Sequence, residues 1–406
     1  MGRGEIRRRN EGSIKIGPRL LEILSQLGEI ELEDVEIEVE DLEIWWQPGV
    51  GIVAPPKIVP PPRVKPTEIL PEPFEVPLEE YPGRVEEVVL GATKAEGGTR
   101  AKRIVIGGAE SPAFYLFERK PAHPPVIAID TFDMKTSLPR AIRMYVEEVM
   151  EDPPAWAKMA VDKLGADLVS IHLISTDPLI RDTSPKEAAK TVEDVLQAVD
   201  VPIIVGGCGD PRKDAEVFTK VAEVAEGERL LLSSVTLDMD EAGILGRVAK
   251  AAKDHGHAVL AFSSMELNKA KELNRKLYAF LPRDSIVMDL TTAALGYGLE
   301  YSFSIHERAR LAALMGDPEL QHPVLSGTTN AWAAREAWLR MGPEWEPREL
   351  RGALWETITA LALLLAGVDV FMMMHPDAVR TVKKVIEHFN REVKPETMVD
   401  WVSARI

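Results

Sequence analysis

The chain has 406 residues, with 48 Lys and Arg against 65 Asp and Glu, and its formal net charge of −17 disfavours nucleic acid and anionic membranes as partners. Its longest apolar stretch, residues 358–374, is interrupted by Gly367 and Asp369 and predicts a helix, a turn and a strand rather than a membrane span. The basic start of the chain lacks the apolar core of a secretory signal, so we expect a cytoplasmic protein.

The single cysteine and the absence of common cofactor-binding motifs exclude several classes of reaction. Cys208 is the only cysteine, which excludes a disulfide within the chain and an iron–sulfur cluster ligated by this chain alone. The sequence has no GxxxxGK[ST] loop, no GxGxxG after a first strand and no histidine spacing typical of zinc. We therefore expect neither ATP hydrolysis, nor Rossmann-type nicotinamide chemistry, nor a tightly bound metal.

Residues 1–47 predict a small acidic segment. Residues 18–27 have helical apolar spacing, and Val35, Ile37 and Val39 then alternate with acidic residues as in a strand with one polar face. Two or three short strands bury too little surface to fold alone. We interpret the segment as a solvated acidic edge, with a docking element for another subunit as the alternative.

Residues 48–82 predict a linker. Ten prolines fall within residues 48–77, a density that favours extended polyproline II structure and opposes a packed helix or a central strand. The N-terminal segment is thus expected to be tethered to the rest of the chain at a variable distance.

Residues 84–108 predict a β-hairpin, with strands at 85–90 and 102–106. A hairpin ahead of a first barrel strand is expected to close the N-terminal end of that barrel. The alternative is a contact with an acidic partner through exposed basic side chains, namely Lys94, Arg100, Lys102 and Arg103.

Residues 83–406, which include this hairpin, predict an α/β (β/α)₈ TIM barrel. Eight short apolar runs alternate with amphipathic helical stretches, and runs without polar alternation suit strands buried on both faces. The spacing of the units matches the usual size of this fold. The runs lie at 125–130, 168–173, 202–207, 231–236, 257–262, 285–290, 323–328 and 368–374.

Polar side chains gather directly after these runs, where a barrel places its functional loops. The candidates for acid–base chemistry are Asp130, Asp177 and Asp289, although an aspartate at a strand end commonly caps the next helix. His375 precedes a proline and is either a structural histidine or one that points across the mouth, and residues 372–374 are interpreted as core methionines. The mouth is therefore predicted to hold or cover a large, mostly neutral molecule, without a complete catalytic constellation.

Several stretches resemble one family, the small (delta) subunit of the corrinoid iron–sulfur protein of the acetyl-CoA decarbonylase/synthase complex. The resemblance covers about residues 83–390, and the acidic extension and proline linker look like the longer, archaeal-type form. The stretches are LGATKAEGGTR (90–100), EDPPAWAKMAVDKLGADLVSIHL (151–173), VGGCGD (205–210), LGYGLEYSFSIHERARLAALMGD (295–317) and the segment 351–379.

The resemblance implies a heterodimer with a gamma (large) subunit that supplies both the [4Fe–4S] cluster and the corrinoid-binding domain. The corrinoid would lie at the barrel mouth, shared between the two chains. A methyl group would pass from a methyltetrahydropterin to cobalt and on to acetyl-CoA synthase/CO dehydrogenase components, in the Wood–Ljungdahl pathway or in methanogenesis from acetate. The positions expected to face the corrinoid are Thr291, Thr292, Ser326, Thr328 and His375.

Two other functions stay open. The barrel itself could be a methyltetrahydropterin:corrinoid methyltransferase that holds the pterin through Asp130, Asp289 and Asn330, or the chain could be a purely architectural subunit. Pairing with another subunit further predicts exposed apolar residues at the rim, for which the candidates are Met265, Tyr297 and Trp332.

Overall fold

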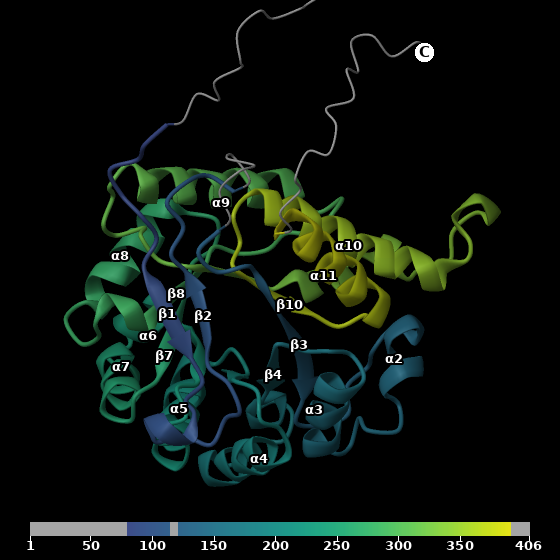
Figure 1. The fold of residues 1–406 in the computed structure, drawn as a ribbon. Helices are drawn as coiled ribbons and strands as arrows, with labels where there is room; N and C mark the ends of the chain where they lie inside the picture. The colour runs from purple at the N-terminus through teal and green to yellow at the C-terminus, as the bar shows by residue number, and fades with distance from the viewer. Residues whose placement is uncertain (1–78, 114–120, 391–406) are drawn as a thin grey trace, which may run out of the picture. The chain divides into compact units, whose positions relative to one another are not determined.

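The computed structural model describes residues 79–113 and 121–390 (Figure 1). The predicted acidic segment, residues 1–47, and nearly all of the predicted linker, residues 48–82, lie outside the described residues, so both stay predictions.

Eight parallel strands form a closed barrel in chain order, because the last strand pairs with both its predecessor and the first. Each strand falls within or close to one of the predicted apolar runs, so the predicted fold class is confirmed. The strands are β3 (Val126–Phe132), β4 (Leu168–His172), β5 (Ile203–Gly206), β6 (Leu231–Val235), β7 (Ala258–Phe262), β8 (Ile286–Asp289), β9 (Val324–Ser326) and β10 (Val370–Met373).

Helices surround this barrel (Figure 1). Three of them begin at a side-chain cap followed by proline, with Asp152, Ser184 and Asp210 accepting a hydrogen bond from a backbone N–H of the first turn. No helix among residues 79–113 and 121–390 is long and apolar enough to cross a bilayer. The helices are α2 (Arg140–Val146), α3 (Pro153–Asp162), α4 (Pro185–Ala198), α5 (Pro211–Val224), α6 (Leu237–Glu241), α7 (Leu245–Asp254), α8 (Leu267–Leu277), α9 (Leu299–Leu314), α10 (Arg348–Leu365) and α11 (Pro376–Asn390).

The pleat of the strands decides which side chains enter the barrel. Ile127 and Ile129 of β3 pack outward against the helices, whereas Ala128 between them belongs to the core inside the barrel. The inner core continues around the ring through Leu168, Ile204, Leu231, Leu260, Val287, Leu325 and Val370. Because side chains alternate, the residue two positions after each of these points inward again, one step nearer the mouth.

A β-hairpin closes the opposite end of the barrel. It consists of β1 (Glu87–Leu90) and β2 (Ile104–Gly107), and it lies across the barrel strands in Figure 1. Leu90 and Ile106 pack into the same core as the inner barrel residues. The Gly91 N–H donates to Arg229 O (2.9 Å), just before β6. The predicted hairpin and its closing role are confirmed.

The basic side chains of the hairpin differ from the prediction in one respect. Arg100 was expected to be exposed, but it is only 3% exposed and pairs with Glu228 at 2.8 Å. Its guanidinium also donates to the carbonyl oxygens of Leu196 and Val199, which a loop arginine at the surface could not reach. Arg103 is exposed, as predicted, and pairs with Glu96.

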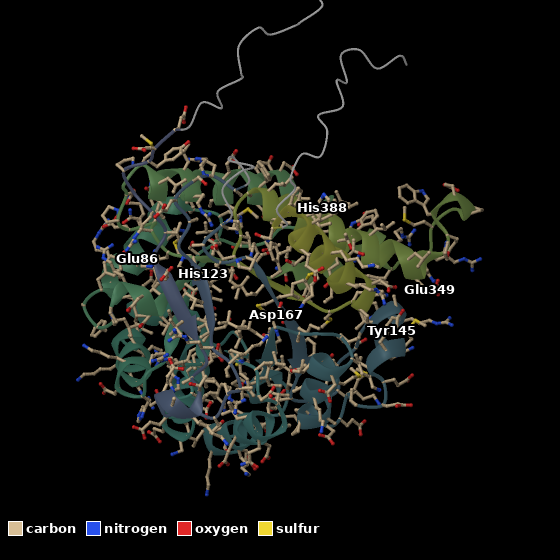
Figure 2. The ribbon with its side chains drawn as sticks, viewed as in Figure 1. Glu86, His123, Tyr145, Asp167, Glu349 and His388 are labelled. Carbon is tan, nitrogen blue, oxygen red and sulfur yellow. The ribbon has the colours of Figure 1, made fainter. Side chains whose placement is uncertain are left out.

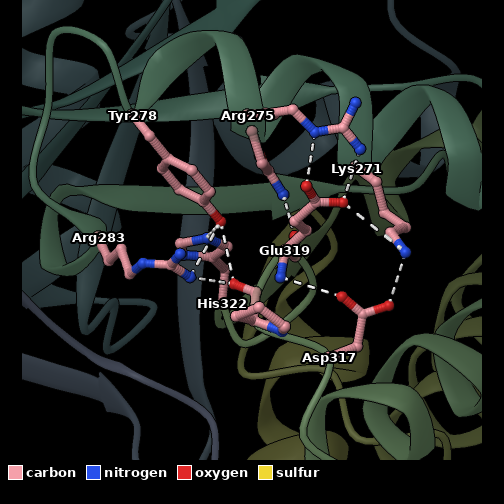
Figure 3. A network of polar contacts seen from close by, with 9 residues as sticks. Lys271, Arg275, Tyr278, Arg283, Asp317, Glu319 and His322 are labelled. Carbon is pink, nitrogen blue, oxygen red and sulfur yellow. Dashed lines mark hydrogen bonds and ion pairs between the residues drawn. The ribbon is translucent and has the colours of Figure 1, made fainter.

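A polar network joins α8 to the segment that leads into β9 (Figure 3). Lys271 pairs with Asp317 at 2.8 Å, and Arg275 pairs with Glu319 at 2.6 Å. The Tyr278 hydroxyl lies 2.7 Å from His322 Nε2. Burial, together with the charge of Arg283, lowers the pKa of the His322 imidazole to about 4, so that it is neutral and can accept this hydrogen bond.

Removing that hydroxyl tests the network. Tyr278→Phe is expected to lower the free energy of unfolding by about 1–2 kcal/mol, because the buried His322 loses a partner. Urea unfolding at neutral pH measures the loss. The control is Tyr301→Phe, at a side chain that is 67% exposed. Equal stabilities for the two variants would contradict the assignment.

Candidate functional site

Several strands carry a polar side chain at the inward position nearest the mouth, directly above an apolar one. Asp130 of β3 stands beside Ser170 of β4 in the strand register, and Phe132 stands beside His172. On the far side of the ring, Asp289 ends β8. The barrel therefore carries carboxylates, a hydroxyl and an imidazole at its open end, above an apolar interior.

Asp130 and His172 form an ion pair, with Asp130 Oδ1 and His172 Nε2 3.0 Å apart. The Ser170 hydroxyl lies 3.3 Å from the same nitrogen. Thr329 donates its hydroxyl to the other Asp130 oxygen and also lies 3.1 Å from Met372 O. Asp130 was expected to cap a helix; instead it is 2% exposed and holds a histidine. Sequence reasoning missed this pair.

Charge around His172 favours its protonated form. Burial alone would lower the pKa of the imidazole, but the charge and hydrogen bond of Asp130, with the charge of Asp133, raise it above its ordinary value. Asp133 is held in turn by Ser175, whose N–H donates at 3.1 Å. Burial raises the pKa of the Asp133 carboxyl, and the bonds from Ser175 oppose that shift.

Asp289 is the third carboxylate of the mouth. Its Oδ1 accepts a hydrogen bond from Thr291 N at 2.8 Å, within the loop rather than at a helix. Burial raises the pKa of the carboxyl to about 6, and the Thr291 amide only partly offsets that effect. Thr291 adopts φ +72°, a conformation that is costly for a β-branched residue, and its hydroxyl donates to Ser263 O at 2.9 Å.

Three of the predicted hydroxyl residues form a buried chain. Thr292 Oγ1 lies 2.8 Å from Ser326 Oγ, which lies 2.9 Å from Thr328 Oγ1. All three residues are buried. Asn330 donates from Nδ2 to Thr292 O at 3.0 Å and so ties the loop after β9 to the loop after β8. The structure thus brings Thr292, Ser326 and Thr328 together, with Asn330 at their edge.

His375 lies in the loop between β10 and α11. Its Nδ1 accepts from Asp377 N at 3.1 Å, and burial lowers the pKa of the ring. The ring stacks on Trp332 (5.9 Å) and meets Tyr145 edge-on (5.3 Å).

Trp332 was predicted to be an exposed rim residue, but it is only 7% exposed because it packs under α2 and α10. Of the other two rim candidates, Tyr297 is 53% exposed, as predicted, and Met265 is partly buried. The predicted core methionines, residues 372–374, are buried.

Glu356 is a buried acid that the sequence reading missed. It lies on the inner face of α10, is fully buried, and accepts from the backbone N–H groups of Met374 (2.6 Å) and His375 (2.9 Å). Burial raises the pKa of this carboxyl to about 7, although the two backbone hydrogen bonds act to lower it. The charge of Asp130 raises it further. Its only sign in the sequence is that it is the one charged residue between Gly352 and Leu365 of this helix.

The raised pKa makes a prediction about stability. Because the folded protein holds the Glu356 proton more tightly than the unfolded chain, this residue's contribution to stability is expected to fall as the pH rises from about 4.5 to about 7. Wild type should therefore lose about 2–3 kcal/mol relative to Glu356→Gln across that range. Chemical denaturation at a series of pH values tests this, with Glu307→Gln on α9 as the control. A constant difference between wild type and Glu356→Gln would contradict it.

The outer face of α10 is apolar. Leu350, Leu354, Ile358 and Leu365 are each at least 41% exposed, and their spacing places them along one side of the helix. Helix α2 packs beside α10 and adds the exposed Met144 and Tyr145; Figure 2 shows Tyr145 near Glu349 at the start of α10. We call these six exposed side chains the α10 patch. Exposed apolar patches of this kind usually mark binding surfaces.

Comparison with known proteins identifies relatives over most of the chain. The family described as CO dehydrogenase/acetyl-CoA synthase delta subunit matches residues 87–374. A protein of Archaeoglobus fulgidus named acetyl-CoA decarbonylase/synthase complex subunit delta is 56% identical over 335 residues, covering 81% of this chain and 73% of that protein. The protein of that name from Methanothermobacter thermautotrophicus is 48% identical over 390 residues, covering 95% of this chain and 96% of its own.

Solved structures similar to this chain include two dihydropteroate synthases. The enzyme of Yersinia pestis gives a TM-score of 0.43 at 15% identity, covering 66% of this chain and 93% of that one. The enzyme of Coxiella burnetii gives a TM-score of 0.44 at 15% identity, covering 75% and 99%.

Proposed function

This chain belongs to the family of CO dehydrogenase/acetyl-CoA synthase delta subunits, and from that membership we propose that it is the barrel subunit that pairs with a corrinoid-binding gamma subunit. In this proposal the barrel mouth covers the corrinoid while a methyl group moves between a methyltetrahydropterin and the acetyl-CoA synthase. The relatives are named as subunits of an acetyl-CoA decarbonylase/synthase complex, and that is the observation on which the proposal rests.

Cysteine usage supports a division of labour between the two chains. With Cys208 as its only cysteine, the chain has too few thiolates for a [4Fe–4S] cluster, which therefore belongs on the partner. The α10 patch supports pairing, because exposed leucines and isoleucine on one helix face lose contact with water when a partner covers them.

The mouth supports a covering role rather than a bond-making one. Of the five positions predicted to face the corrinoid, Ser326 ends β9 and the other four follow β8, β9 and β10. Four of the five are buried, and we propose that they form the layer directly beneath the corrinoid. Their polar atoms are largely engaged with one another or with backbone, as the chain from Thr292 to Thr328 illustrates. Such a surface fixes shape and orientation without supplying a nucleophile.

Reconstitution tests the pairing. The chain and a corrinoid iron–sulfur gamma subunit should form a stable 1:1 complex at micromolar concentration by native mass spectrometry and size-exclusion chromatography. Metal analysis of the separated chains should find cobalt and iron on the partner alone. Failure to co-migrate, or stoichiometric iron on this chain, would contradict the proposal.

A second candidate, methyl transfer by the barrel itself, is favoured by one observation. Asp289 keeps its proton at higher pH than an ordinary aspartate, as a group that assists protonation of a pterin would. If the barrel only covers the corrinoid, Asp289→Asn should slow methyl transfer by about tenfold or less. A loss of about a thousandfold in methylpterin-to-cobalt kinetics, in a variant that still pairs, would favour the methyltransferase instead.

A further inference from the structure

We propose that His172 donates a hydrogen bond through Nδ1 to a carbonyl oxygen of the ligand in the barrel mouth, and that Asp130 is the positioning residue for this contact. The inference rests on the proposed function, which places a ligand there. Beyond the proposed function, the inference names the side chain that recognises this ligand and the chemical group of the ligand that is recognised.

The imidazole is held at one nitrogen and on one face of the ring. Nε2 faces Asp130 Oδ1 at 3.0 Å, and the ring stacks on Phe132 with centroids 5.2 Å apart and planes 27° apart. Asp130 is itself fixed by the hydroxyl of Thr329. Because Nε2 contacts the Asp130 carboxylate and one face of the imidazole stacks on Phe132, the direction in which Nδ1 points is fixed as well.

That other nitrogen points toward the end of β5. A Cβ built on Gly206 would lie 2.8 Å from His172 Nδ1, so only a glycine leaves room for the ring at this position. Nδ1 has no hydrogen-bond partner among the described residues, and the side chain of His172 is 22% exposed. An oriented nitrogen without a protein partner, open at the mouth, is available to a ligand.

The charges around the ring decide what that ligand group is. The Asp130 carboxylate, 3.0 Å from Nε2, stabilises the imidazolium, in which both ring nitrogens carry a proton, so Nδ1 acts as a donor. Asp133 adds a second carboxylate nearby, and the carboxyl of Glu356 lies close enough to feel the charge of Asp130. Arg181 lies close enough to Asp133 to lower the pKa of that carboxyl, so the carboxylates of Asp130 and Asp133 balance the charges of His172 and Arg181. The site therefore offers an anion no net positive charge, and a neutral acceptor is favoured. A neutral carbonyl oxygen fits, and both a corrinoid amide side chain and the ring carbonyl of a pterin offer one.

Binding measurements with two probes test the inference. One arm measures the dissociation constant of the pair formed with the corrinoid-loaded gamma subunit and, for reference, with the corrinoid-free gamma subunit. The other arm measures binding of 5-methyltetrahydrofolate to the full chain. His172→Phe with Asp130→Asn keeps the stacked ring and removes both the donor and the carboxylate that would be left unpaired. It is expected to weaken binding about 10–100-fold in the arm whose ligand supplies the carbonyl.

Two further variants separate this contact from a general loss of structure. Gly206→Ala keeps every hydrogen-bonding group but pushes the ring aside, so it should weaken the same arm. His255→Gln, at the end of α7, should change neither arm. Binding should weaken as the pH rises and His172 loses its proton. In Asp130→Asn this weakening should begin at a lower pH, because the carboxylate no longer stabilises the imidazolium. A purely structural Asp130 would change the affinity without moving that pH.

The outcomes are distinct. If the variants lose affinity only for the corrinoid-loaded gamma subunit, the carbonyl belongs to the corrinoid. If they lose affinity only for 5-methyltetrahydrofolate, the carbonyl belongs to the pterin. If wild type binds a probe and neither His172→Phe/Asp130→Asn nor Gly206→Ala weakens that binding, the inference is wrong while the proposed function stands. If wild type binds neither the partner nor the pterin, both are wrong.

Discussion

An Arg100→Met variant is expected to unfold with a free energy about 3–5 kcal/mol lower than that of the wild type. Glu228 would keep its buried carboxylate without the guanidinium 2.8 Å away, and the carbonyl oxygens of Leu196 and Val199 would lose their donors. The hairpin holds the closed end of the barrel through this side chain, so its loss should also loosen the hairpin. Urea unfolding and hydrogen exchange of the hairpin amides measure the two effects.

The hairpin supplies its own control. Arg103 makes an ion pair with Glu96 at 2.9 Å, but its side chain is 55% exposed, so Arg103→Met should cost at most about 1 kcal/mol. In the double variant Arg100→Met/Glu228→Met no charge is left unpaired, and much of the lost stability should return. Equal costs for Arg100→Met and Arg103→Met would show that burial of this pair does not matter.

The second large effect concerns pairing. Leu354→Glu with Ile358→Glu is expected to weaken the complex with the gamma subunit by about 100-fold or more, because a covering partner would have to bury two charges without counter-ions. The fold should be unaffected, since both side chains are exposed on α10. The dissociation constant from analytical ultracentrifugation or biolayer interferometry is the measurement.

The matched control lies on another helix. Val224→Glu on α5 changes an apolar side chain that is 42% exposed, outside the α10 patch, and it should leave pairing unchanged. If Val224→Glu abolished pairing and the α10 variant did not, the docking surface would lie elsewhere on the barrel.

The fold could be predicted from the sequence because its cause is local. The part of a strand that is buried on both faces must be apolar, so each strand from β3 to β10 begins as an apolar run, and polar residues follow only toward the mouth in β3, β4, β6, β8 and β9. The hairpin is predictable for a similar reason: two short β-prone stretches flank a glycine-containing turn.

The site was harder because its causes are not local. The pairing of Asp130 with His172 depends on the register of two strands whose paired residues are about forty positions apart in the sequence. The burial of Arg100 depends on a glutamate 128 positions away, and nothing in the turn sequence reveals that neighbour. Glu356 could have been suspected, since a lone acid on the inner face of a mostly apolar helix needs donors, but those donors are backbone N–H groups of the loop after β10.

The hairpin across one end of the barrel leaves a single entrance. If a partner covers the mouth as proposed, a small ligand beside Asp130 and His172 has to arrive before that partner and can depart only after it has moved away. At a site with one open end, the order of binding is then fixed: the ligand binds first, the partner binds second, and the partner has to dissociate before the ligand can. Turnover at this barrel would then be timed by the opening of the pair, however fast the chemistry beneath it.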